Sequence, residues 1–136
     1  MSRMAECCCG SLRAEVSGDP ILVGACHCEQ CQRRTGSPFG VSAYFPADQV
    51  RVSGSSKVFT RDGQDGRRVR MGFCPDCGST VFWEADFLPG HVAIAVGAFC
   101  DPAFPPPSFS IWERTKHPWV TLAAELQRRL DQDAPK

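Results

Sequence analysis

The sequence predicts a mainly β protein, an antiparallel β fold with zinc knuckles and a short C-terminal helix. Short stretches of alternating apolar and polar residues recur along the chain, and turn-forming residues separate nearly all of them. Only two stretches have helical character. Seven of the nine cysteines stand in three tight groups, which is typical of metal sites that pin the turns of a small β domain.

The strands are predicted from this alternation and from the turns that bound it. The alternation from Leu12 to Val16 ends at Gly18-Asp19-Pro20, as expected for a half-buried strand followed by a turn. Ile21 to Ala25 then leads directly into the central group of cysteines. The remaining strands are predicted, in chain order, over Gly40 to Phe45, Val50 to Ser53, Lys57 to Arg61, Arg67 to Phe73, Thr80 to Glu84, His91 to Val96 and Ser108 to Trp112.

The two helical stretches are a short turn from Glu29 to Thr35 and a segment from Leu122 to Leu130. In the second segment leucine repeats every four residues, which places the leucines on one face of a helix that would cover a sheet. Asp101 to Pro107 holds four prolines in seven residues and is therefore expected to be an irregular loop, because proline lacks the backbone donor of a sheet ladder.

Length and charge limit the classes of protein to which the chain can belong. Its 136 residues suit a single domain over residues 1–136, and its zero net charge argues against attraction of the whole molecule to nucleic acid or to a membrane surface. The longest apolar run, Val92 to Cys100, is far shorter than the roughly 20 residues of a membrane span. The number of cysteines is odd, and Met1 to Gly10 lacks the apolar stretch of a signal peptide. Both features favour reduced thiols, so we expect a cytoplasmic protein of undetermined oligomeric state.

Two of the cysteine groups together predict a structural zinc site. Cys74 and Cys77 belong to a C-x-x-C-G knuckle between two strands, and such a tight turn aims both sulfurs at one point. Cys7 and Cys9 supply the other half, because residues two apart on an extended chain point to the same side. A thioredoxin-type redox pair is the alternative, but a strand rather than a helix follows Cys77. Cys8 should point the other way, as a small buried thiol.

The third group, the triplet Cys26, Cys28 and Cys31, predicts a second zinc with an open position. Nothing nearby plainly completes the ligand set, and His27 would face away from a metal shared by its two neighbours. Three protein ligands and one exchangeable position form the pattern of catalytic zinc, which is also expected to be the more labile metal. The alternative is a closed site that recruits Cys100 or Cys8. Cys100 ends an apolar strand, where a buried free thiol is expected.

The open site favours chemistry on a thiol. A zinc ion held by three thiolates carries net negative charge, so it activates water poorly but holds a fourth thiolate well at neutral pH. Arg33 and Arg34 follow the triplet directly and would pair with the carboxylates of a peptide thiol, since guanidinium groups bind carboxylates in a bidentate manner. Two solvated arginines on a helical turn are the alternative.

These motifs resemble the family of glutathione-dependent formaldehyde-activating enzymes, which includes centromere protein V. The matching features are Cys7-Cys8-Cys9-Gly10, the C-H-C-x-x-C group at Cys26 to Cys31, Arg33-Arg34-Thr35-Gly36, Phe73 to Ser79 and His117-Pro118-Trp119-Val120. The resemblance implies an Mss4-like (β-tent) fold, a structural zinc on Cys7, Cys9, Cys74 and Cys77, and a second zinc on Cys26, Cys28 and Cys31. It also implies a carbon-sulfur lyase activity on the adduct of glutathione and formaldehyde.

The competing hypothesis is a zinc-ribbon-like binding module without catalysis. It would use Arg61, Arg67, Arg68 and Arg70 on adjacent strands to hold nucleic acid or an acidic partner. The zero net charge and the aspartates scattered among these arginines argue against it.

Overall fold

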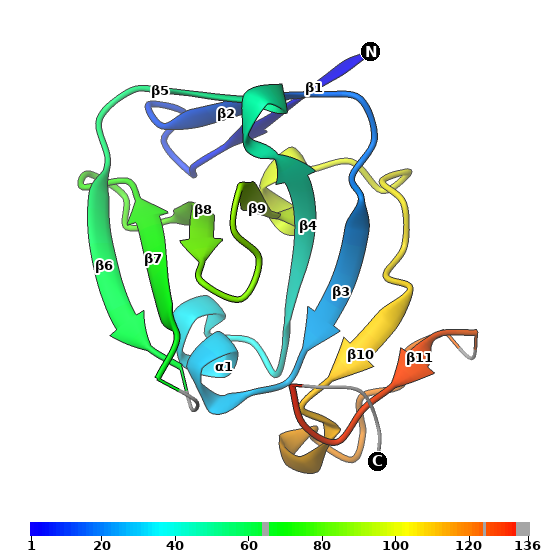
Figure 1. Cartoon of the computed structure of the whole chain (residues 1–136). Helices are drawn as coiled ribbons and strands as arrows, with labels where there is room; N and C mark the ends of the chain where they lie inside the picture. The colour runs from blue at the N-terminus through cyan, green and yellow to red at the C-terminus, as the bar shows by residue number, and fades with distance from the viewer. Residues whose placement is uncertain (64–65, 124, 133–136) are drawn as a thin grey trace. The chain divides into compact units, whose positions relative to one another are not determined.

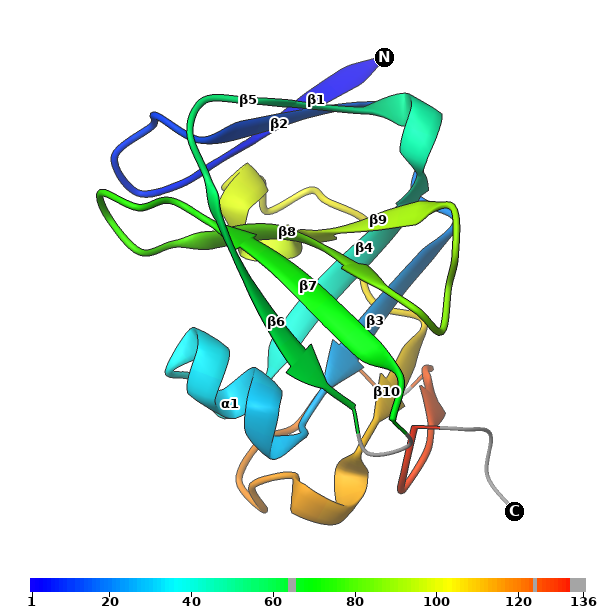
Figure 2. The same ribbon diagram turned by 60° about the vertical axis from the view of Figure 1, so that its left-hand side comes forward.

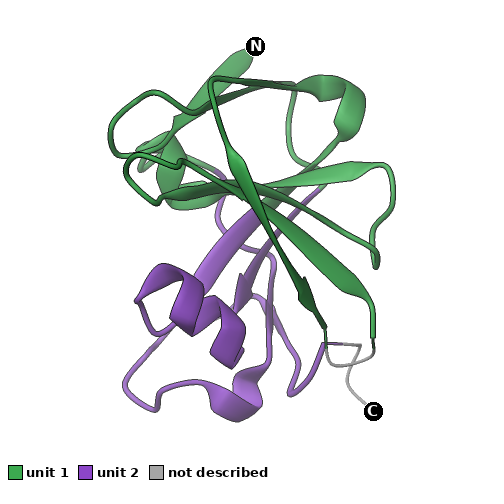
Figure 3. Cartoon of the chain, turned by 90° about the vertical axis from the view of Figure 1, so that its left-hand side faces the viewer, with its two compact units in different colours: residues 1–21, 43–104 green, residues 22–42, 105–136 purple. Residues whose placement is uncertain are grey.

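A computed structural model of the chain describes residues 1–63, 66–123 and 125–132. It confirms the mainly β class predicted from the sequence (Figure 1). The chain forms two compact units, one of residues 1–21 and 43–104 and the other of residues 22–42 and 105–136 (Figure 3). The expectation of a single domain over residues 1–136 stays a prediction.

Each strand predicted from the sequence is present, and the predicted helical turn is the helix α1, Glu29–Thr35. The strands are β1 Ser2–Glu6, β2 Arg13–Ser17, β3 Leu22–Cys26, β4 Gly40–Pro46, β5 Val50–Ser53, β6 Lys57–Asp62, β7 Arg68–Phe73, β8 Thr80–Ala85, β9 His91–Ala95, β10 Phe109–Ile111 and β11 Gln127–Arg128. Short 3-10 turns are η1 Ala47–Gln49, η2 Val96–Phe99 and η3 Glu113–Thr115. The sequence did not predict β1 or β11.

The first unit begins with a small antiparallel sheet in the order β1-β2-β5, whose strands lie side by side in Figure 2. Ala5 of β1 pairs with Ala14 of β2, which pairs in turn with Val52 of β5. Ala5, Ala14 and Val16 are buried, whereas the other residues of β1 and β2 are wholly or partly exposed. The alternation visible in the sequence therefore marks the face that this sheet buries.

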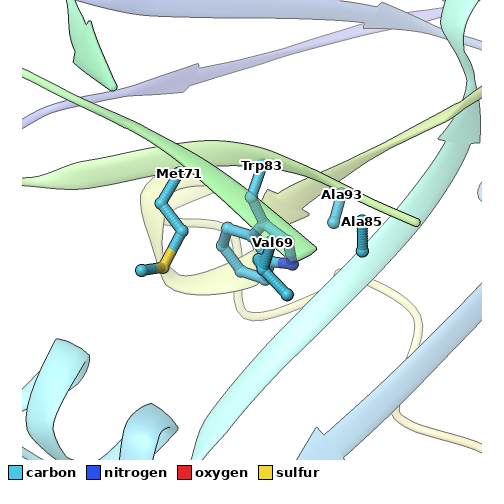
Figure 4. Close-up of a cluster of buried hydrophobic side chains, with 5 residues drawn as sticks. All are labelled: Val69, Met71, Trp83, Ala85 and Ala93. Atoms are coloured by element: carbon cyan, nitrogen blue, oxygen red, sulfur yellow. The ribbon is translucent and has the colours of Figure 1, made fainter. Parts of the chain in front are cut away.

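The same unit contains a second antiparallel group of strands in the order β9-β8-β7-β6. Its inward side chains form one buried cluster of Val69, Met71, Trp83, Ala85 and Ala93, shown in Figure 4. Trp83 stands directly opposite Met71 and beside Ala93, so one indole joins three strands. Burial of such large side chains supplies the main stabilisation of the strands that carry the Cys74 knuckle.

The second unit carries the triplet. Here β10 pairs in parallel with both β3 and β11, a departure from the antiparallel sheet expected from the sequence. Phe109 stands opposite Gly24, and its ring occupies the space that a side chain at position 24 would need. The chain passes from β3 through the triplet into α1, which ends at Gly36 in the left-handed conformation.

The predicted C-terminal helix over Leu122 to Leu130 was wrong for the residues of that stretch that the structure describes; residue 124 lies outside them. The backbone N–H groups of Gln127 and Arg129 donate instead to the carbonyls of Ser108, just before β10, and of Ser110 on β10. The leucine repeat forms no common apolar face, because Leu126 is buried and Leu130 is exposed. Among the described residues, no helix has both the length and the apolar character needed to cross a membrane.

Candidate functional site

Two hairpin turns of the first unit hold four cysteines in matching positions. Cys7 follows β1 and its N–H donates to Leu12 O (3.0 Å), while Cys74 follows β7 and its N–H donates to Ser79 O (2.9 Å). A glycine with positive φ then turns the chain in each, Gly10 in the first and Gly78 in the second. Both turns therefore direct their sulfurs to the inside of a tight bend, as zinc knuckles do.

The four sulfurs converge on one point. Cys9 Sγ lies 3.6 Å from Cys7 Sγ and 3.6 Å from Cys74 Sγ, and with Cys77 all four sulfurs lie within 4.8 Å of one another. Sulfurs bound at about 2.3 Å to a tetrahedral zinc ion lie about 3.8 Å apart, whereas a disulfide would bring two of them to about 2 Å. The geometry of this four-cysteine site therefore fits a bound metal and not a disulfide.

Hydrogen bonds already favour thiolates in the four-cysteine site. The Ser79 hydroxyl and backbone N–H lower the pKa of Cys77 to about 5. The N–H groups of Leu12 and Asp76 point at Cys7 Sγ (3.2 Å) and Cys74 Sγ (3.4 Å). In contrast, although Ser11 favours a thiolate at Cys9, the neighbouring thiols raise the pKa of Cys9. Four thiolates this close repel one another, so their joint ionisation requires a cation at the centre.

The triplet brings three sulfurs together at the end of β3 and the start of α1. The sulfurs of Cys26, Cys28 and Cys31 lie within 4.8 Å of one another, and all three side chains are half-buried. Cys28 is the N-cap of α1, since its sulfur accepts from Cys31 N (3.3 Å). Hydrogen bonds with the other two thiols, and then burial, raise the pKa of Cys26. Without a cation the Cys26 thiol therefore holds its proton, whereas a bound metal would favour its thiolate.

His27 takes no part in either cluster. Its ring is fully buried, and its Nε2 lies 2.9 Å from Ser110 Oγ on β10. Burial lowers the pKa of His27 below its usual value, so the ring is neutral near pH 7. The only described groups of three or more His, Cys, Asp or Glu side chains that could hold a metal are the two cysteine clusters. Among the described residues, the triplet cluster consists of three sulfurs and the other cluster of four.

Two expectations about the remaining cysteines were wrong. Cys8 and Cys100 were both expected to be buried thiols, and both are exposed. Cys8 sits at the outer side of the first knuckle, where its N–H donates to Ser79 Oγ (3.1 Å) and so links the two turns. Cys100 follows η2 with a positive φ of 50°, which turns the chain outward at the end of the apolar segment. Neither belongs to a metal cluster.

Three of the four arginines of the binding-module hypothesis have partners within the first unit. Arg68 lies 3.5 Å from Asp62, Arg70 lies 3.0 Å from Asp86, and Arg67 packs over the ring of Phe87. A surface that binds nucleic acid presents its guanidinium groups to phosphates instead. No observation in the described residues favours that hypothesis.

The comparisons with known proteins agree with the cysteine pattern. A model of the family described as glutathione-dependent formaldehyde-activating enzyme matches residues 2–115, which include all seven clustered cysteines. A search of curated proteins found no significant match. Among solved structures, the chain is similar to a crystal structure of a Rhodobacter sphaeroides protein from a structural genomics programme. The TM-score is 0.56 and the identity 20%, with 78% of this chain and 92% of that chain covered, so this likeness concerns the fold alone.

Proposed function

The chain belongs to the family of glutathione-dependent formaldehyde-activating enzymes, and from this membership we propose that it is a zinc-dependent carbon-sulfur lyase acting on adducts of glutathione and a small aldehyde. The four-cysteine site is the structural zinc site and the triplet is the catalytic one. The observation that carries the proposal is the difference between the two clusters, four converging sulfurs in one and three in the other.

The proposed reaction joins the glutathione sulfur to the carbonyl carbon of formaldehyde. The carbonyl oxygen takes up the proton that the thiol gives up, and the reverse reaction cleaves the same carbon-sulfur bond. Zinc bound at the triplet would keep the thiol of the substrate deprotonated and oriented. No electron leaves the system, so the reaction requires no redox partner.

The residues of the triplet provide the framework for this chemistry. Cys28 caps α1, so its sulfur is held by the first turn of the helix, and Cys31 lies in that same turn. Cys26 is the last residue of β3. The three ligands thus come from a strand end and a helix start, two rigid elements that hold a site more firmly than a free loop does.

Arg34 is the arginine that supports recognition of the glutathione carboxylates. It lies three residues after Cys31 and therefore on the same face of α1. Gly40 leaves room for it, because a Cβ at that position would stand 2.6 Å from the Arg34 guanidinium. Arg33 is exposed on another face of the helix. We assign the carboxylate contact to Arg34 rather than to Arg33.

The free state of all nine cysteines supports a reducing compartment such as the cytoplasm as the place of action.

The proposal is tested by Cys28→Ser, with Cys8→Ser as the matched control. Serine retains the N-cap of α1 but is a much weaker zinc ligand, so Cys28→Ser should lose formation of S-hydroxymethylglutathione and keep its melting temperature. Cys8→Ser should keep both properties. Wild-type turnover by Cys28→Ser would refute the assignment of the active site.

A further inference from the structure

A chain of four hydrogen-bonded side chains leads from the triplet to the C-terminal strand. His27 Nε2 lies 2.9 Å from Ser110 Oγ, Ser110 Oγ lies 2.7 Å from Glu113 Oε2, and Arg128 Nη1 lies 3.1 Å from the same Glu113 oxygen. His27 and Ser110 are both fully buried. We call these four residues, His27, Ser110, Glu113 and Arg128, the His27 chain.

The chemistry of these groups determines the direction of each hydrogen bond. The Glu113 carboxylate only accepts, so Ser110 donates its single hydroxyl proton to Glu113. The Ser110 oxygen is then left as the acceptor for His27 Nε2–H. The other ring nitrogen, Nδ1, is buried without a hydrogen-bond partner in the described part of the protein. The bond to Ser110 is therefore the polar anchor that orients the ring.

The backbone of His27 is held by the same elements. Its carbonyl oxygen accepts from Thr115 Oγ1 (2.7 Å) and from Gln32 Nε2 (2.9 Å), and its N–H donates to Ile111 O (3.1 Å). Hydrogen bonds to residues of β10, η3 and α1 thus hold the backbone of residue 27 in place. Because Cys26 and Cys28 are its neighbours in the chain, the position of residue 27 determines where both of their Cα–Cβ bonds point.

We propose that His27 is a positioning residue and that the His27 chain sets the affinity of the triplet for zinc by holding the three sulfurs in their converging arrangement. The inference rests on the metal role given to the triplet in the proposed function, but not on the reaction. A metal site whose ligands are oriented in advance by a second layer of hydrogen bonds binds its ion more tightly, and loss of such a layer costs about 10- to 100-fold in affinity.

The chain also gives the C-terminal segment a role at the metal site. Arg128 lies on β11, beyond residue 115, where the family match ends. A second ion pair, Arg114 with Asp131 (3.1 Å), links η3 to the same C-terminal segment through two hydrogen bonds between these side chains. The two ion pairs therefore form a matched comparison for the path through Glu113.

The test measures zinc affinity of the triplet by competition with a chromophoric chelator, together with the charge-transfer spectrum of the cobalt-substituted protein. His27→Gln places an amide nitrogen near the position of Nε2 and can still donate to Ser110, whereas the shorter His27→Asn cannot reach it. We expect His27→Asn and Ser110→Ala to lower the affinity of the triplet for zinc by about 10- to 100-fold and to alter the cobalt spectrum. His27→Gln should retain most of the wild-type affinity.

Variants of the two ion pairs keep the proposal testable if a substitution at His27 prevents folding. Like Ser110→Ala, Arg128→Met should weaken zinc binding at the triplet, whereas Arg114→Met should not. Equal losses from these two variants, or wild-type affinity in both Ser110→Ala and Arg128→Met, would overturn the inference. Wild-type protein that binds a single zinc ion would instead contradict the metal role of the triplet, and thereby the proposed function.

Discussion

Replacement of Cys74 by serine tests the structural role of the four-cysteine site. Cys74 is fully buried, and its sulfur lies 3.6 Å from that of Cys9, 65 residues earlier in the chain. A metal that joins these two turns acts as a cross-link closing a long loop, and the loop-entropy relation gives about 4 kcal/mol for a closure of this length. Since small domains have a total stability of about 5–15 kcal/mol, this loss is a large fraction.

The assay is thermal unfolding of the zinc-saturated protein, with metal content measured on the same sample. Cys74→Ser should lower the melting temperature by about 10–20 °C and lose one zinc per chain. Cys100→Ser, at an exposed cysteine outside both clusters, should leave both values unchanged. An unaltered melting temperature with full zinc content in Cys74→Ser would refute the assignment of Cys74 as a ligand.

Three further predictions concern the two sites. Dilute chelator should remove the triplet's zinc first and leave the circular dichroism spectrum unchanged, and release of both ions together with unfolding would contradict this order. Iodoacetamide should modify Cys8 and Cys100 in the zinc-loaded protein, while Cys9, which is also exposed, stays protected until zinc is removed, as peptide mass spectrometry would show. Equal reactivity of Cys9 would contradict its ligand role. Arg34→Met should raise the KM for glutathione about tenfold and Arg33→Met less than about twofold, and the reverse order would transfer the carboxylate contact to Arg33.

Local patterns predicted most of the fold because they reflect burial. The strands from β2 to β10 were predicted where apolar residues alternate or cluster between turns. The structure buries such residues in β2, β3, β4, β7, β8, β9 and β10, whereas β5 and β6 contain no buried residue. In β1, Ala5 is the only buried residue, so its sequence shows no alternation. The C-terminal leucines have helical spacing, but Gln127 and Arg128 pair with β10, a long-range contact that a spacing rule cannot detect.

The cysteine clusters were predicted because ligand spacing is a local property. Cys74 and Cys77 share one turn, and Cys26, Cys28 and Cys31 lie within six residues. The role of His27 was not predictable, since its partner Ser110 lies 83 residues away. The exposure of Cys8 and Cys100 was also missed, because it depends on the path of a turn and on a positive φ at a residue other than glycine.

The central claim, that the triplet is an open metal site for a substrate thiol, is tested most directly by titrating glutathione into the cobalt-substituted protein while following the sulfur-to-metal charge-transfer absorption. With S-methylglutathione as the control that lacks a free thiol, the account predicts that millimolar glutathione increases this absorption and that the control does not. No spectral change at millimolar glutathione, or the same change with S-methylglutathione, would contradict it.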